Sequence, residues 1–134
     1  MQKKFVAVLN KKIETGRAIN ALGHMTIGLL SQLSTDEAQA INYQDKDGGA
    51  HIGSKLPFII LKAKNSNKIS TLRQQLIDKN IPFASFNNCM IEKSWEDQIE
   101  ILSKTSEKDL EYFGVCMYGD KEILEELTKK FSLF

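Results

Sequence analysis

The sequence has few of the residues that build metal and disulfide sites. Its 134 residues include only two cysteines and two histidines, and the spacing of these four side chains predicts no metal site. No run approaches the roughly 18 consecutive apolar residues that a membrane span needs, so we expect no membrane contact. The apolar run at residues 5–9 is shorter than the roughly 7–15 residues of a signal-peptide core. We therefore expect a cytoplasmic protein, with Cys89 and Cys116 as free thiols that pack in the interior.

The sequence also has almost no excess of charge of either sign. Eighteen basic and seventeen acidic residues leave a formal charge of +1. Affinity for nucleic acids comes mainly from neutralised phosphates, so this balance speaks against a tRNA partner. The length fits one domain over residues 1–134, and 42% hydrophobic with 26% charged residues is typical of a globular domain. No motif indicates a cofactor, and we expect none.

The apolar patterning predicts strands that alternate with helices. Short, almost continuously apolar runs are typical of strands covered on both faces, and they occupy residues 4–9, 56–63, 81–86 and 110–118. Helices are expected near 16–33, over 66–78, 95–102 and 121–130, with Thr15 as the cap of the first. An Asp-Gly-Gly turn signal within residues 43–51 predicts a hairpin or an exposed loop. This order predicts an α/β fold, an open sheet with helices on both faces.

The first helix carries the most informative side chains. At 100° per residue, one apolar arc must face the sheet, and Arg17, Asn20 and His24 fall together on a different arc. A guanidinium, an amide and an imidazole side by side can bind an anion and transfer a proton. Gly23 and Gly28 each cost about 1 kcal/mol inside a helix, which suggests close approach by a backbone, a substrate or a second subunit. An ordinary solvated face is the alternative.

Two other groups of residues call for a structural interpretation. Trp95, Ile99 and Leu102 are spaced for one face of a helix, which predicts that this tryptophan packs in the core. A basic cluster follows the second strand, and we interpret it as a solvated edge, with a phosphate contact as the alternative. It consists of Lys62, Lys64 and Lys68.

Several segments, in this order and spacing, are shared with a known family. They are residues 4–10, the stretch Gly-Arg-Ala-Ile-Asn-Ala-Leu-Gly-His at 16–24, the Tyr…Asp-Gly…His segment at 43–51, residues 57–63 and residues 110–119. Together they resemble the family called domain of unknown function 2000. The opening strand and helix are also similar to type II peptidyl-tRNA hydrolases, whose helix reads G-K-x-A-A-Q-x-x-H. The resemblance implies the hydrolase II-like fold, a three-layer α/β/α arrangement with a four-stranded mixed sheet in the order 2-1-4-3, strand 4 antiparallel. It also implies a homodimer.

The functional residues of those hydrolases are only partly matched. Their helix lysine corresponds to Arg17, which keeps the charge but cannot lose a proton to act as a base. Their glutamine corresponds to Ala21, and their Asp-Ala-Gly-x-Thr stretch corresponds to Phe-Asn-Asn-Cys-Met at residues 86–90. The resemblance therefore implies the fold of the hydrolases with an incomplete catalytic set.

Three functions agree with the sequence. In the first, a small anionic or acyl substrate is bound or hydrolysed: Arg17 holds the anion, Asn20 orients it and His24 acts as general acid or base. Asp47 and His51 would complete this site if the hairpin folds back over the first helix, and are otherwise solvated turn residues. In the second, the same helix face belongs to a non-enzymatic dimeric module that binds a small ligand or a protein. The third is divergent peptidyl-tRNA hydrolysis.

Overall fold

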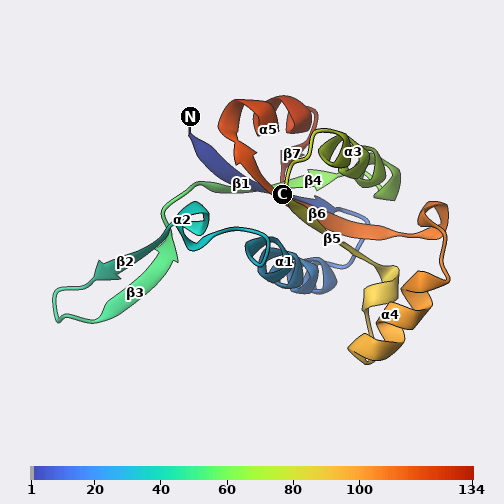
Figure 1. Cartoon of the computed structure of the whole chain (residues 1–134), viewed down its shortest axis with the longest axis horizontal. Helices are drawn as coiled ribbons and strands as arrows, with labels where there is room; N and C mark the ends of the chain where they lie inside the picture. The colour runs from blue at the N-terminus through green and yellow to red at the C-terminus, as the bar shows by residue number, and fades with distance from the viewer. Residues whose placement is uncertain (1) are drawn as a thin grey trace.

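A five-stranded mixed sheet forms the centre of the computed structural model, which describes residues 2–134 (Figure 1). β1 pairs in parallel with β4 and antiparallel with β6, and β6 also pairs antiparallel with β5. The order is β5-β6-β1-β4-β7, formed by β1 (Lys3–Asn10), β4 (Phe58–Ala63), β5 (Phe83–Asn87), β6 (Tyr112–Asp120) and β7 (Ser132–Leu133). The expected strands lie in the expected order 2-1-4-3, but the expected number of four is wrong. The C-terminal β7 pairs with the edge of β4 and adds a fifth strand.

Helices cover both faces of this sheet, which gives the three-layer α/β/α arrangement (Figure 1). α1 (Thr15–Leu30) packs on one face, and α3 (Ser66–Asp78) and α5 (Lys121–Thr128) pack on the other. Side chains alternate between the faces of a strand, so β1 contributes to both cores. Phe5, Ala7 and Leu9 pack toward α1, whereas Val6 and Val8 pack toward α3 and α5.

The first helix begins and ends slightly differently from the prediction. The carboxylate of Glu14, and not the hydroxyl of Thr15, caps it by accepting a hydrogen bond from the Gly16 N–H. The helix ends at Leu30, before the expected end near Leu33. Its predicted apolar arc is confirmed within the helix, where the fully buried side chains are Ala18, Ala21, Met25 and Leu29. Leu22, on the same arc, is partly buried, and Leu33 lies beyond the end of the helix.

The segment around residues 43–51 forms a hairpin. β2 (Ala40–Gln44) and β3 (Ala50–Ser54) pair antiparallel in a separate two-stranded sheet, preceded by the short α2 (Thr35–Ala38). The Asp45 carboxylate accepts hydrogen bonds from the backbone N–H groups of Asp47 and Gly49, each at 2.9 Å, which fixes the turn. Figure 1 shows the hairpin extending away from the central sheet, so it does not fold back over α1.

The segment after β5 forms a small projecting unit at one end of the sheet (Figure 1). It contains the 3₁₀ turn η1 (Asn88–Met90), α4 (Trp95–Ser103) and a second turn η2 (Glu107–Asp109). α4 begins as predicted, with the Ser94 hydroxyl accepting from the Asp97 N–H at 3.2 Å. The expectation that Trp95 is a core residue is wrong, because this helix packs chiefly on η1 and leaves the indole 69% exposed.

Candidate functional site

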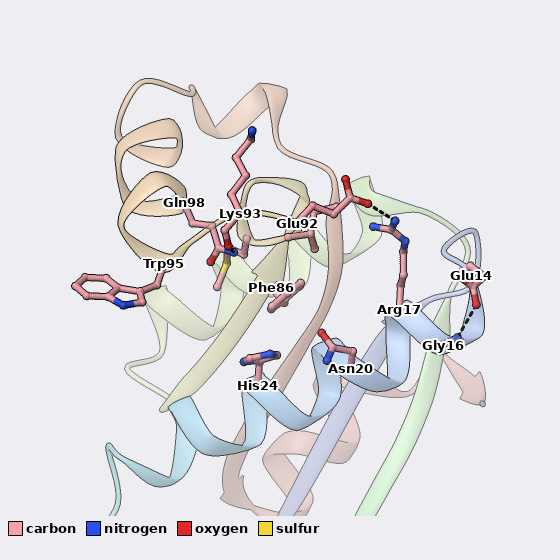
Figure 2. Close-up of a pocket in the computed structure, with 12 residues that line it drawn as sticks. Glu14, Gly16, Arg17, Asn20, His24, Phe86, Glu92, Lys93, Trp95 and Gln98 are labelled. Atoms are coloured by element: carbon pink, nitrogen blue, oxygen red, sulfur yellow. Dashed lines mark hydrogen bonds and ion pairs between the residues drawn. The ribbon is translucent and has the colours of Figure 1, made fainter.

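An open cavity of about 610 Å³ lies between the first half of α1 and the segment that joins β5 to α4 (Figure 2). Arg17, Asn20 and His24 all line it from the α1 side. The opposite wall is formed by residues from the β5 end and the projecting unit, among them Phe86, Met90, Ile91, Glu92, Trp95 and Gln98. The structure therefore brings three of the five expected site residues into one cavity.

The packing of α1 aims its polar arc at this cavity. Small residues on the buried face let the helix lie close to the sheet: Ala18 and Ala21 are both 0% exposed. At Gly28 an added Cβ would lie 3.4 Å from the Cβ of Ala84 on β5, an ordinary van der Waals contact. Gly23 faces open space, with nothing within 4 Å of an added Cβ. Of the two glycines, only Gly28 therefore faces a neighbouring element of the protein.

The imidazole of His24 lies on the ring of Phe86. The ring centroids are 5.6 Å apart and the planes differ by 28°, a stacked arrangement. Phe86 is a core residue with 3% exposure, whereas His24 is exposed to the cavity. Within residues 2–134, no hydrogen bond to another residue engages either ring nitrogen of His24. The stacking therefore positions the imidazole and leaves both nitrogens available to a bound molecule.

Arg17 forms an ion pair with Glu92 on the far side of the cavity (Figure 2). The guanidinium lowers the pKa of Glu92, mainly through this hydrogen bond and then through its charge, and the carboxylate raises the pKa of Arg17 in return. Glu92 adopts a left-handed backbone conformation with φ +64°, which costs energy for any residue with a Cβ. Sequence reasoning missed Glu92, because no pattern links this loop residue to a helix far away in the chain.

The floor of the cavity is apolar and its rim is polar. Phe86, Met90 and Ile91 pack against the α1-side core, and Trp95 stands at the rim. The Gln98 amide is held by donating to the backbone carbonyl of Lys93 at 2.8 Å. An apolar floor with a few polar groups, within roughly 300–1,000 Å³, is typical of small-molecule sites.

The other two expected site residues lie elsewhere. Asp47 and His51 are on the β2–β3 hairpin, outside this cavity. His51 Nε2 lies 2.8 Å from Asp45 Oδ2, and both side chains are exposed. Hydrogen bonds from His51 first, and then from the backbone N–H groups of Gly49 and Asp47, lower the pKa of Asp45. These residues stabilise the hairpin turn and do not reach the α1 face.

Within residues 2–134, no group of three or more histidine, cysteine, aspartate or glutamate side chains is arranged to hold a metal ion. No helix there is both long enough and apolar enough to cross a membrane. Cys89 and Cys116 are free and buried, as expected.

Comparison with known proteins agrees with the fold and assigns the family. The model of the family described as protein of unknown function (DUF2000) matches residues 3–134. This chain belongs to that family. A solved structure of a protein of unknown function, Atu0240, from Agrobacterium tumefaciens strain C58 has the same fold as this DUF2000 protein. The TM-score is 0.85 at 17% sequence identity, over 100% of this chain and 98% of that one. No curated protein matches the DUF2000 sequence.

Proposed function

We propose that this DUF2000 protein binds a small acyl compound with a separate anionic group in the cavity between α1 and the β5–α4 segment, and hydrolyses it. The observation that carries the proposal is the placement of Arg17, Asn20 and His24 over an apolar floor in one cavity. The proposal extends to the cytoplasm as the compartment, where Cys89 and Cys116 would stay reduced.

The helical spacing of the three polar side chains suggests where a substrate would lie. At a rise of about 1.5 Å per residue, Asn20 and His24 are about 6 Å apart along the α1 axis, and Arg17 is about 10 Å from His24. Asn20 and His24 can therefore act on the same acyl group. Arg17 is suited to an anionic group several bonds away. The apolar part between them would lie on Met90 and Ile91.

Binding of such an anion involves the Arg17–Glu92 ion pair. The guanidinium has five N–H donors, and the structure pairs it with a single carboxylate oxygen of Glu92. A substrate carboxylate can either displace Glu92 or share the guanidinium with it. Glu92 therefore favours anionic ligands at this position, because a neutral ligand interacts too weakly with the Arg17 guanidinium to displace the Glu92 carboxylate.

The hydrolytic step uses water as the nucleophile. No serine or cysteine is among the cavity-lining residues in the described part of the chain. His24 takes a proton from a water molecule as the oxygen of that water attacks the acyl carbon. The Asn20 amide donates to the oxyanion that forms. When the bond from carbon to the leaving group breaks, the protonated His24 returns the proton to the leaving oxygen, giving an acid and an alcohol.

Two p-nitrophenyl esters test this assignment. The monoester of adipate carries a carboxylate away from the ester carbonyl, and the butyrate ester carries none. We expect faster hydrolysis of the adipate ester by the purified protein. Arg17→Gln should remove this preference by raising KM for the adipate ester alone, and Arg17→Lys should retain part of it. His24→Gln should lower kcat for both esters and leave binding of adipate itself unchanged.

The outcomes separate the three functions. Binding of adipate without turnover of either ester would favour the non-enzymatic ligand-binding module. Release of peptide from a peptidyl-tRNA ester, with no turnover of the small esters, would favour divergent peptidyl-tRNA hydrolysis and the proposed relation to those hydrolases. If the Arg17 and His24 variants match the parent in binding and turnover, α1 is not the functional element.

A homodimer is a further part of the proposal. The outward face of α1 carries exposed apolar side chains beside the polar arc, Ile19 at 57% and Ile27 at 71% exposure. The two side chains are about 12 Å apart along the helix axis, and a second copy of the chain would cover both. Sedimentation equilibrium tests this assembly: Ile19→Ser with Ile27→Ser should shift a dimeric mass to about 15.2 kDa, the mass of one chain. A parent protein that sediments at that mass removes the dimer from the proposal.

A further inference from the structure

A second cavity, of about 670 Å³, lies on the opposite side of the sheet from the candidate site. It is enclosed by α3, α5, the ends of β1 and β4, and β7. Lysines dominate its wall, which includes Lys11, Lys62, Lys64, Lys68, Lys129 and Lys130. Part of this group was expected from the sequence as a solvated basic edge, but the structure places it around a concavity together with lysines from two other segments.

The charge of this cavity contrasts with that of the whole chain. Its six lysines face one lining carboxylate, Glu126, which Lys129 contacts at 2.7 Å. The remainder of the chain has twelve basic and sixteen acidic residues. Among residues 2–134, the five lysines other than Lys129 have no carboxylate within 4.0 Å. The molecule therefore concentrates uncompensated positive charge here, and like charges that are held together favour binding of an anion.

The inner wall of the cavity is apolar. Leu72 is fully buried in the core beneath it, and Leu127 and Phe131 are partly buried beside it. Gln75 supplies an exposed side-chain amide next to these residues. Apolar surface surrounded by lysines suits a ligand that combines an uncharged apolar or aromatic group with several negative charges.

We propose that this cavity binds a compact polyphosphate that carries an apolar or aromatic group, the class of the nucleoside di- and triphosphates. The phosphates would contact Lys64 and Lys68, and the uncharged part would pack on Leu127 and Phe131 with Gln75 beside it. A compact ligand fits better than a long nucleic acid because the rest of the chain is net negative and would repel phosphates that extend beyond the cavity. The proposal is independent of the function assigned to the α1 cavity.

Calorimetric titration with ATP, tripolyphosphate and adenosine tests the ligand chemistry. We expect ATP to bind more tightly than tripolyphosphate, and adenosine to bind weakest, because only ATP uses both the lysines and the apolar wall. Affinity for ATP should fall with added salt, since exposed charges are screened. Equal affinities for ATP and adenosine would overturn the proposal. So would the absence of ATP binding at millimolar concentration.

Charge-matched variants test the location. Lys64→Gln with Lys68→Gln removes two exposed cavity lysines, and should weaken ATP binding by about tenfold or more. Lys55→Gln with Lys79→Gln makes the same change in net charge outside the cavity and should leave the affinity unchanged. Amide chemical shifts should move at residues 62–75 and 126–132 and not at residues 14–24. Equal loss in both double variants, or shifts confined to residues 14–24, would overturn the assignment. So would RNA that binds where ATP does not.

Discussion

Arg17 and Glu92 are 75 positions apart in the sequence, and their side chains pair across the α1 cavity. The pair joins the first turn of α1 to the loop before α4, so one salt bridge connects the two walls of the candidate site. Glu92 holds this position with a left-handed backbone. Glu92, whose backbone is strained, thus pairs with the arginine that lines this cavity. An anion that binds Arg17 must compete with this carboxylate.

The first prediction removes the charge of this carboxylate. Glu92→Gln keeps an oxygen that can accept from the guanidinium but no longer neutralises Arg17, so an anionic ligand competes more easily. We expect KM for mono-p-nitrophenyl adipate to fall severalfold, with KM for the neutral butyrate ester unchanged. Glu111→Gln, an exposed carboxylate away from the cavity, is the matched control. An unchanged KM for the adipate ester in Glu92→Gln would show that the ion pair does not limit binding.

The second prediction uses the only tryptophan of the chain as a reporter. Trp95 stands at the rim of the α1 cavity with 69% of its surface exposed. We expect red-shifted emission that acrylamide quenches efficiently. A ligand that enters the cavity should shift the emission to the blue and protect the indole from quenching, because it excludes water from one face of the ring. If titration calorimetry detects binding of adipate or phenylpropionate but the tryptophan emission does not change, the ligand binds elsewhere.

The exposure of Trp95 could not be predicted from the sequence. Helical periodicity placed Trp95 and Ile99 on one face of a helix, and that helix exists at Trp95–Ser103. Periodicity does not say whether a face is covered, and both side chains are largely exposed, at 69% and 62%. By contrast, α3 has the predicted bounds of Ser66–Asp78, because its apolar stripe lies directly on the sheet.

The candidate site was predictable on one wall only. The spacing of Arg17, Asn20 and His24 fixes their common direction on a helix, and the structure places them in one cavity. The facing wall depends on how the loop after β5 turns at Glu92, for which local sequence carries no signal. The two-residue strand β7 was missed for a related reason, since Ser132–Leu133 is too short to show any period.

The third prediction concerns packing at a glycine of β6. A Cβ at Gly114 would lie 2.9 Å from Cδ2 of Leu9 and 3.0 Å from the backbone oxygen of Val8. The backbone oxygen cannot move away without distorting β1, so we expect Gly114→Ala to destabilise the protein by about 1–3 kcal/mol. Thermal unfolding followed by circular dichroism measures this change.

A second glycine supplies the control for that substitution. Gly23 lies inside α1, and nothing within 4 Å would meet its Cβ. Gly23→Ala should therefore stabilise the protein by about 1 kcal/mol, the helix propensity difference. If this variant is destabilised as well, another molecule occupies the space beside Gly23, and a dimer contact on α1 becomes the explanation to test.

The fourth prediction concerns the reactivity of Cys116 on β6. The side chain is 0% exposed, and its burial raises the pKa of the thiol to about 12. Disulfide exchange needs the thiolate, so this cysteine should not react with Ellman's reagent at pH 8 in the native protein. In a Cys89→Ser background, one equivalent should react only after denaturant is added. Reaction of the native variant at the rate of a free thiol would contradict the burial.

The raised pKa of Cys116 also makes the free energy of unfolding decrease as the pH rises. The unfolded chain releases this proton near the ordinary cysteine pKa of about 8.5, whereas the native protein keeps it up to about pH 12. A raised native pKa stabilises the fold fully below the unfolded pKa, and this contribution is lost as the pH rises toward the native value. Lysines and tyrosines titrate in the same range, so the parent is compared with Cys116→Ala. The difference in urea midpoint between the two should shrink from pH 8 to pH 10.5, and a constant difference would show that the thiol has no raised pKa.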